Sequence, residues 1–313
     1  MLCRAGMDFY ADPPGTKLEL ASRFVPALGG SAANIAVAIA RLGGSASLVS
    51  AVSDDAVGRY ILNQLKHYGV GADHVRVASG EVRSSLAVVE TRNENCQNVI
   101  YRNGAADFEL TEDAVTAIRL KNFDALIVTG TALAKEPSRR AALKAMTLSK
   151  AAGLSIILDV DYRPYSWASA QEAAAIGLQA ATLADLIVGN DVEFDVLANG
   201  TAGQDLAKRL AQEQGKAVIY KMGEKGSVTY QGHQMFETPI FPVKALKPTG
   251  AGDSFMGGLV MALQSGMDLA ESVRRGSAAA AIVVTRVGCA PAMPTGKELE
   301  SFLQAQQAPR QAG

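Results

Sequence analysis

Four short apolar runs between residues 124 and 223 constrain the fold of this chain more than any other feature. They are rich in β-branched residues, and each ends at Gly, Asn or Asp: DALIVTG (124–130), LSIILDVD (154–161), ADLIVGN (184–190) and KAVIYKMG (216–223). Ala- and Leu-rich segments with a helical period separate them. Continuous apolar strands joined by helices are typical of a parallel sheet covered on both faces. The sequence therefore predicts an α/β fold, a doubly wound and mostly parallel sheet flanked by helices, with ligands beyond the carboxyl ends of its strands.

Residues 80–108 have a different pattern. SSLAVVETR (84–92) and QNVIYRNGA (97–105) flank the turn-like Asn93-Glu94-Asn95, which predicts an antiparallel hairpin. Together with residues 9–28, this hairpin is expected to form a small β-sheet lid over the edge of the main sheet. Because no domain-scale linker interrupts the chain, we expect residues 1–313 to form a single domain with lid segments at about 9–28 and 80–108.

Composition and charge exclude several classes of protein. The net charge of −1 gives no reason to expect a nucleic acid or an anionic membrane as a partner. No apolar run approaches the roughly 18 residues of a membrane helix, and the N-terminus does not resemble a signal peptide. Cys3, Cys96 and Cys289 are odd in number and far apart, which fits neither a disulfide framework nor a zinc site. We therefore expect a cytoplasmic protein.

The stretch KPTGAGDSFMGG (247–258) places a carboxylate and several glycines at the start of an apolar helix. Glycines let backbone amides approach a ligand closely, and the first amides of a helix are unpaired and partly positive. Gly250, Ala251 and Gly252 therefore predict an anion hole for a phosphate or a developing oxyanion. Asp253 beside it is a candidate general base. The alternative is that Asp253 only complements the helix dipole, an effect worth about 0.3–1 kcal/mol.

A second helix start lies in LGGSAANIAVAIARLGG (28–44). Ser31 is a plausible N-cap, and the small residues that follow allow close packing. Asn34 falls one turn later, where its amide can point back over the bend at Gly29 and Gly30 and meet a sugar hydroxyl. The alternative is an Ala-rich core helix whose one polar residue faces solvent.

Polar residues also follow three of the predicted strands. Asn190 and Glu193 have the spacing of a capping box, and they equally suit a water-coordinated Mg²⁺. Arg163 follows the strand that ends at Asp161 and suits bidentate binding of a phosphate or carboxylate, with a surface ion pair as the alternative. Lys221 is available to nucleotide phosphates, although the residues after it would also fit an ordinary β-turn.

Taken together and in this order, these stretches resemble the ribokinase-like (PfkB) family of sugar kinases. The signatures are GGSAAN (29–34), NDVE (190–193) and TGAGDSF (249–255), and the resemblance covers essentially the whole chain. Two other familiar nucleotide-binding motifs are absent from the sequence, the G-x-x-x-x-G-K-[ST] P-loop and the G-x-G-x-x-G of dinucleotide-binding proteins.

The resemblance implies a role for each matching residue. Asp253 would deprotonate the primary hydroxyl of a sugar, which then attacks the γ-phosphate of ATP, while the amides of Gly250, Ala251 and Gly252 stabilise the transferring group. Asn190 and Glu193 would position Mg²⁺. Six residues would contact the substrate: Asp8, Gly29, Gly30, Asn34, Arg102 and Arg163. Five would border the nucleotide: Lys221, Gly223, Gly226, Thr249 and Ser277.

Four further strings narrow the resemblance to the branch of the family that acts in inositol catabolism: RAGMDFYADPPG (4–15), YRNGAAD (101–107), LDVDYRPYSW (158–167) and VVTRVGCAPAMPT (283–295). The implied activity is ATP-dependent phosphorylation of a keto-deoxy sugar acid at its terminal hydroxyl, with 5-dehydro-2-deoxy-D-gluconate as the substrate. Alternatives in the same family are 2-keto-3-deoxygluconate and fructose. An alternative of another class is a catalytically silent regulator that binds sugar or nucleotide.

The resemblance also implies ATP and Mg²⁺, with a monovalent cation as a further candidate, and a homodimer paired through exposed strands of the lid. Three positions depart from the family pattern. Only three residues precede Arg4, where such kinases usually have a full apolar strand. Ser277 stands where Asn is frequent, and Lys247-Pro248 precedes the GAGD stretch where an apolar or β-branched residue is more common.

Overall fold

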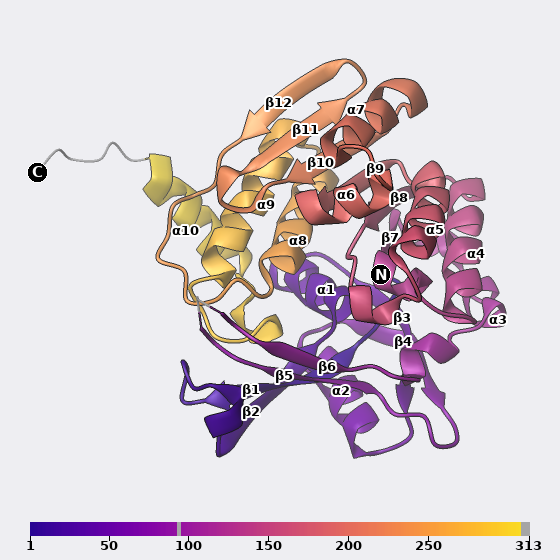
Figure 1. Ribbon diagram of the computed structural model, residues 1–313, viewed down its shortest axis with the longest axis vertical. Helices are drawn as coiled ribbons and strands as arrows, with labels where there is room; N and C mark the ends of the chain where they lie inside the picture. Colours follow the sequence, from indigo (N-terminus) through magenta and orange to yellow (C-terminus); the bar gives the residue numbers. More distant parts are fainter. Residues whose placement is uncertain (93–94, 308–313) are drawn as a thin grey trace, which may run out of the picture.

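The computed structural model describes residues 1–92 and 95–307. Its largest sheet has the strand order β12-β11-β10-β9-β8-β7 (Figure 1). The strands are β7 (Ala125–Thr129), β8 (Ser155–Asp159), β9 (Leu186–Asn190), β10 (Ala217–Lys221), β11 (Ser227–Gln231) and β12 (Gln234–Thr238). The first four are parallel, and β11 and β12 continue the sheet in antiparallel pairing. Each of the four predicted apolar runs is one of the parallel strands, so this prediction is confirmed.

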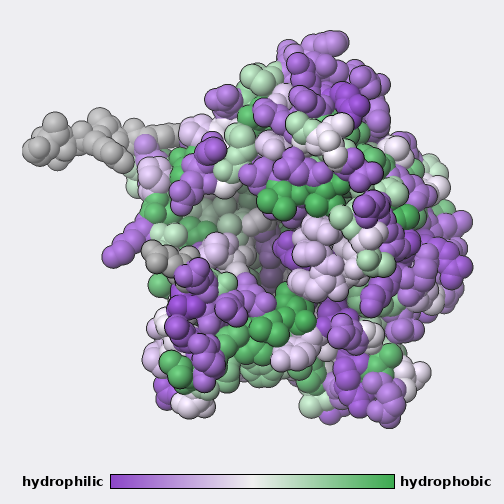
Figure 2. All heavy atoms as spheres, in the orientation of Figure 1, coloured by the Kyte–Doolittle hydropathy of each residue, from purple (hydrophilic) through white to green (hydrophobic). Residues whose placement is uncertain are grey.

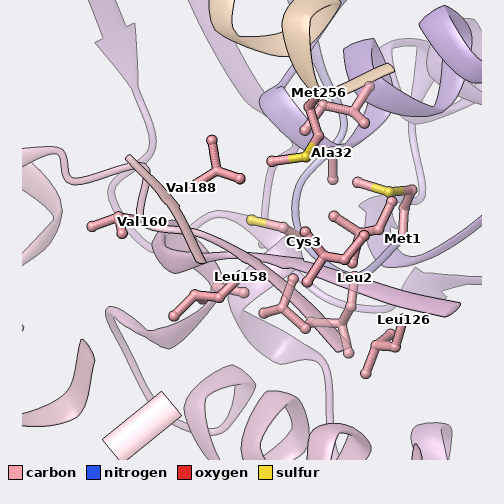
Figure 3. Packing of buried hydrophobic residues seen from close by; sticks show 14 of the residues in the cluster. Met1, Leu2, Cys3, Ala32, Leu126, Leu158, Val160, Val188 and Met256 are labelled. Carbon is pink, nitrogen blue, oxygen red and sulfur yellow. The ribbon is translucent and has the colours of Figure 1, made fainter. Parts of the chain in front are cut away.

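Leu2 joins the large sheet to a second pair of parallel strands, β3 (Ser47–Ser53) and β4 (Gly71–Ala78). It forms one parallel bridge with Val49 of β3 and another with Val128 of β7. The short segment before Arg4 therefore occupies a strand position in the middle of the molecule. Figure 3 shows that the residues around it are apolar and come from both helices and strands: Met1, Cys3, Ala32, Leu126, Leu158 and Met256.

Helices cover both faces of the sheet (Figure 1). One group packs together on one side: α1 (Ser31–Arg41), α8 (Ala251–Gln264), α9 (Leu269–Val283) and α10 (Gly296–Gln307). The other group packs against β7 to β11: α4 (Ser138–Ala151), α5 (Ala170–Leu183), α6 (Asp191–Ala198) and α7 (Gly203–Gln214). Two more, α2 (Ala56–His67) and α3 (Glu112–Thr116), lie near β3 and β4. Helix α8 lies between α1 and α9, where its glycines allow close contact, because a Cβ at Gly257 would collide with Ala38.

A separate four-stranded sheet has the order β2-β1-β5-β6. Its strands are β1 (Gly6–Asp12), β2 (Arg23–Gly29), β5 (Ser85–Val89) and β6 (Asn98–Tyr101). The pairing of β5 with β6 is antiparallel, which confirms the predicted hairpin, while its turn includes residues 93–94, outside the described residues. In the orientation of Figure 1 this sheet lies in the lower part of the molecule beside α2, and Figure 2 shows the surface hollowed above it.

Helix α1 corrects one prediction. Its N-cap is Gly30, with φ of 93°, and Ser31 is the first helical residue instead of the cap. The Ser31 hydroxyl donates a hydrogen bond to Asp161 on the far side of the site, at 2.8 Å. The helix begins one residue earlier than predicted, so Ser31 lies inside its first turn, and its hydroxyl binds the Asp161 carboxylate that follows β8. Within the described residues, no helix is long and apolar enough to cross a membrane.

Candidate active site

Helices α1 and α8 begin side by side, and each has a glycine as its N-cap. Gly30 and Gly250 have φ angles of 93° and 85°, in a region that L side chains rarely adopt. Neither glycine can supply a side-chain cap, and in the described part of the chain no side chain caps the first turn of α8. The first amides of that helix therefore have the arrangement that binding of an anion requires.

Asp253 is the third residue of α8 and lies where the first turns of α1 and α8 meet. Its Oδ2 accepts a hydrogen bond of 2.8 Å from Nδ2 of Asn34 on α1. Burial is the main cause that raises the pKa of Asp253 to about 7; the bond from Asn34 opposes the shift, and the charge of Asp161 adds to it. A carboxyl group with a pKa near neutrality can both accept and release a proton at physiological pH, as a general base must.

The side-chain amide of Asn34 donates to Asp253, and the side chain is buried, so the alternative in which Asn34 faces solvent is wrong. The space beside Gly29 is filled by the Asp8 carboxyl, with which any Cβ at Gly29 would collide. Asn34 is only 4% exposed, and its Oδ1 has no hydrogen-bond partner among the described residues. A buried acceptor without a partner is costly, so this oxygen is suited to a ligand hydroxyl.

Asp8 lies on β1 and is buried. The Tyr10 hydroxyl lies 3.3 Å from its Oδ2 and 3.1 Å from the Cys289 sulfur. Burial raises the pKa of Asp8, while the charge of Arg4 and the hydrogen bond from Tyr10 act in the opposite direction. Asp8 therefore places a buried carboxyl group on the side of the site formed by the four-stranded sheet.

The carboxyl end of β8 brings two more carboxylates into the site. Asp161 has φ of 36°, a conformation uncommon for a residue with a side chain. Its Oδ2 accepts hydrogen bonds from Ser31 and from Thr131, at 2.8 and 3.0 Å, and its Oδ1 pairs with Arg163 at 2.8 Å. Burial raises the pKa of Asp159 well above its usual range, and the charge of Lys221 opposes that shift.

Asn190 and Glu193 form the capping box of α6. Oδ1 of Asn190 accepts from the Glu193 amide at 2.9 Å, and Oε2 of Glu193 accepts from the Asn190 amide at 2.8 Å. The structural alternative for this pair is therefore confirmed. The second carboxylate oxygen of Glu193 lies 3.6 Å from Arg163, so the pair also borders the acidic cluster at the end of β8. In residues 1–92 and 95–307, no group of three or more His, Cys, Asp or Glu side chains is arranged to hold a metal ion directly.

The predicted nucleotide residues lie around the start of α8 and the end of β10. The Lys221 ammonium is 3.6 Å from the position that a Cβ at Gly252 would take, so it borders the first turn of α8. Gly223 and Gly226 flank the turn into β11, where Gly226 is required because a Cβ would collide with the Thr238 carbonyl. Two others complete the predicted set: Thr249, which directly precedes α8, and Ser277, which is partly buried on α9.

Arg102 is not a free cation at this site. Its Nε and Nη2 pair with Asp107, its Nη1 donates to the Thr131 carbonyl at 3.1 Å, and its guanidinium lies 4.1 Å from the centre of the Phe108 ring. The side chain is buried, with Cys3 at its remaining edge. These contacts account for its donors within the core, and they do not support the predicted contact with a substrate.

The structure also places residues at the site that the sequence interpretation did not assign to it. Arg4 precedes β1, and its charge affects the pKa of Asp8, Asp161 and Asp253. Lys247 is fully buried and donates to the Thr249 carbonyl, and the departure from the family pattern at Lys247 was the signal for it. The string LDVD, with two acids at a strand end, was the signal for Asp159.

Comparisons with known proteins identify the family and the fold of this chain. The model of the pfkB family of carbohydrate kinases matches residues 3–296. The 5-dehydro-2-deoxygluconokinase of Photobacterium profundum is 42% identical over 311 residues, covering 97% of this chain and 94% of that protein. A double mutant of the fructokinase of Vibrio cholerae, solved with fructose, ADP and a potassium ion, has a TM-score of 0.85 and 26% identity over 97% of both chains. A putative ribokinase II of E. coli, 24% identical over 97% of this chain and 98% of its own, has a TM-score of 0.88, so the predicted ribokinase-like fold is confirmed.

Proposed function

The chain belongs to the pfkB family of carbohydrate kinases, and we propose that within this family it phosphorylates a keto-deoxy sugar acid, 5-dehydro-2-deoxygluconate, with ATP as the phosphoryl donor. The observation that supports the chemistry is the pairing of Asp253 with Asn34 beside the uncapped first turn of α8. It brings a carboxyl group with a raised pKa, a buried amide oxygen without a partner among the described residues and uncapped helix amides close together. The name of the relative from Photobacterium profundum supports the substrate.

In the proposed mechanism, the Asp253 carboxylate takes the proton of the sugar's primary hydroxyl as that oxygen attacks the γ-phosphorus. The bond from this phosphorus to the β,γ-bridging oxygen breaks, and ADP leaves with the electron pair. The amides of Gly250, Ala251 and Gly252 stabilise the charge on the transferring group, and the Lys221 ammonium faces the same turn. Asp8 and Asn34 orient the sugar through its hydroxyls.

The acidic residues at the ends of β8 and β9 fit a hydrated Mg²⁺. This ion usually keeps several waters and is bound through nucleotide phosphates and one or two carboxylates, so it needs no dedicated cluster of protein ligands. Asn190, Glu193 and Asp159 would hold its water shell. Bound there, Mg²⁺ would neutralise charge on the phosphates. We include a monovalent cation in the proposal, with the Thr249 hydroxyl as a candidate ligand, because it is buried and has no hydrogen-bond partner within the described residues.

A homodimer and a cytoplasmic location also belong to the proposal. The outer strands β2 and β6 of the four-stranded sheet expose large apolar side chains: Phe24, Val25, Val99 and Tyr101. Exposed apolar residues on edge strands favour pairing with another copy of the same surface.

Parallel assays of the purified protein with ATP and Mg²⁺ test the substrate. The candidates are 5-dehydro-2-deoxygluconate, 2-keto-3-deoxygluconate and fructose, and each product is identified by its mass. We expect kcat/KM for the first to exceed that for the other two by about ten-fold or more, because a site with hydrogen bonds for one substrate rejects analogues that leave its polar groups unpaired. Faster phosphorylation of fructose would overturn the acid as substrate. ATP binding without any phosphorylated product would favour a silent regulator.

A further inference from the structure

A carboxylate on the substrate needs a cation, because Asp161 stays negative in this site and the other carboxyl groups, Asp8, Asp159 and Asp253, offer it no opposite charge. A negative ligand among like charges is bound only when an opposite charge pairs with it. The cationic side chains around the site differ in how far their donors are already used by the protein. That difference decides which of them is available to the substrate.

Three of the cations are committed. Arg102 is buried against Asp107 in the core. Arg163 pairs with Asp161 at 2.8 Å, approaches Glu193 at 3.6 Å and donates to the Tyr162 carbonyl. Lys247 has no exposed surface and donates to the carbonyl of Thr249 in the loop before α8. The Lys221 ammonium lies on the nucleotide side, next to Gly252.

Arg4 is the exception. Among residues 1–92 and 95–307, its side chain makes one hydrogen bond, from Nη1 to the Ser85 hydroxyl at 3.5 Å, which is long for such a bond. No carboxylate in the described part of the chain lies within 4.0 Å of its guanidinium, although three carboxylates of the site are affected by its charge. Its side chain is partly buried, and most of its five donors have no partner among the described residues.

The backbone holds Arg4 at this position. Its carbonyl lies 2.6 Å from the position that a Cβ at Gly30 would take, so Arg4 packs directly on the residue that caps α1. Asn34, the partner of Asp253, lies one turn further along the same helix. Ser85, the contact of the guanidinium, is the first residue of β5. Arg4 is therefore held between the four-stranded sheet and the start of α1, on the side of the site where Asp8 and Asn34 lie.

We propose that Arg4 binds the carboxylate of the sugar acid and is the residue that selects an acid over a neutral sugar. A guanidinium presents two parallel N–H donors to a carboxylate, which gives both charge and orientation. The site holds the substrate at two ends: Arg4 takes the carboxylate, while Asn34 and Asp253 take the hydroxyl that is phosphorylated. This assignment depends on the proposed substrate.

The test compares Arg4→Gln and Arg4→Lys with the wild type, using 5-dehydro-2-deoxygluconate as the probe. We expect KM for the acid to rise about 10–100-fold in Arg4→Gln and less in Arg4→Lys, because a hydrogen bond to a charged group is lost or weakened. KM for ATP stays within about two-fold. Arg76→Gln is the matched control, since Arg76 is exposed on β4 and its partners among the described residues are Thr111 and Asp113, at the start of α3. Thermal unfolding of each variant measures its stability.

The outcomes separate this inference from the proposed function. Turnover of the acid by the wild type together with an unchanged KM in folded Arg4→Gln overturns the role of Arg4 alone. Absence of turnover of the acid by the wild type overturns the proposed function, and the role of Arg4 with it. If Arg4→Gln does not fold, Arg4→Lys decides the question: a KM for the acid equal to that of the wild type overturns the inference, and a raised KM supports it.

Discussion

The starts of α6 and α8 make an instructive comparison, because each has an acidic side chain as its third residue. In α6 this residue is Glu193, and it closes a capping box with Asn190, so both side chains satisfy backbone amides of their own helix. In α8 it is Asp253, but the N-cap is Gly250, which has no side chain, and the carboxylate bonds to Asn34 of another helix. The same position thus serves local stability in α6 and faces a neighbouring helix in α8.

The residue at the N-cap explains this difference. A polar N-cap pairs with the amide of the third residue and draws the acidic side chain back to its own helix. A glycine leaves the first amides and the acidic group available to other partners, at some cost to local stability. In α8 that cost is accompanied by a raised pKa of Asp253, whereas the Glu193 carboxylate is held by a backbone amide and faces Arg163. A helix start without a side-chain cap therefore leaves backbone amides and a carboxyl group available on this side of the site.

The largest expected effect is that of Asp253→Asn on turnover. The substitution keeps the shape and the hydrogen bond to Asn34 but removes the base, so kcat should fall about 10²–10⁴-fold while ATP binding persists. Initial rates and calorimetric titration with ATP measure the two quantities. If kcat stays within a few-fold of wild type, Asp253 is not the base. The difference between the starts of α6 and α8 would then concern structure alone.

The same variant also reports on the pKa. Because the folded-state pKa of Asp253 is raised from 3.8 to about 7, the folded protein binds more protons at this residue than the unfolded chain between these pH values. The stability contributed by this residue therefore falls as the pH rises from about 4 to 7. We expect Asp253→Asn to unfold at a higher temperature than wild type at pH 8, and the difference in unfolding temperature to be smaller at pH 5. An equal difference at both pH values would contradict the shift.

A smaller effect is expected from Gly252→Ala. A Cβ there would be 3.6 Å from the Lys221 ammonium, an ordinary contact, so the folded protein has room for it. The methyl group would occupy space next to the proposed phosphate position, so kcat/KM for ATP should fall about 10–100-fold without loss of thermal stability. Gly250→Ala is the matched comparison, because φ of 85° and a Cβ 3.1 Å from the Cys289 sulfur predict a loss of stability as well. Unchanged kinetics in Gly252→Ala would speak against an anion site at this turn.

The smallest effect should come from Asn190→Ala in the capped helix. Loss of an N-cap side chain destabilises a protein by about 1 kcal/mol, measured by denaturant unfolding. Ser169→Ala is the control, because Ser169 caps α5 through the Glu172 amide. We expect both variants to lose similar stability. A fall in kcat in Asn190→Ala as large as that in Asp253→Asn would show that the start of α6 is catalytic beyond its cap.

Much of the fold was predictable because it depends on local patterns. The four parallel strands follow from apolar runs that end in Gly, Asn or Asp, and the hairpin of β5 and β6 follows from two short runs around a turn. The capping box was one of two interpretations of the spacing between Asn190 and Glu193, and the other was a Mg²⁺ site. The predicted N-cap of α1 was wrong, because the helix begins one residue earlier, at Ser31. Ser31 instead bonds to Asp161, a carboxylate that nothing in the local sequence brings within reach.

By itself, the sequence determined which residue types are present for the chemistry: an acid after a glycine-rich helix start, an amide one turn into another helix, and acids at the ends of strands. Only the tertiary structure decided their partners. It joined Asn34 to Asp253 across 219 positions, placed Arg102 in the core with Asp107, and left Arg4 without a carboxylate within 4.0 Å in the part of the chain that the structure describes. The physical reason is that backbone patterns act over a few residues, whereas charge, burial and hydrogen bonding depend on groups that meet only when the sheet and its helices are packed.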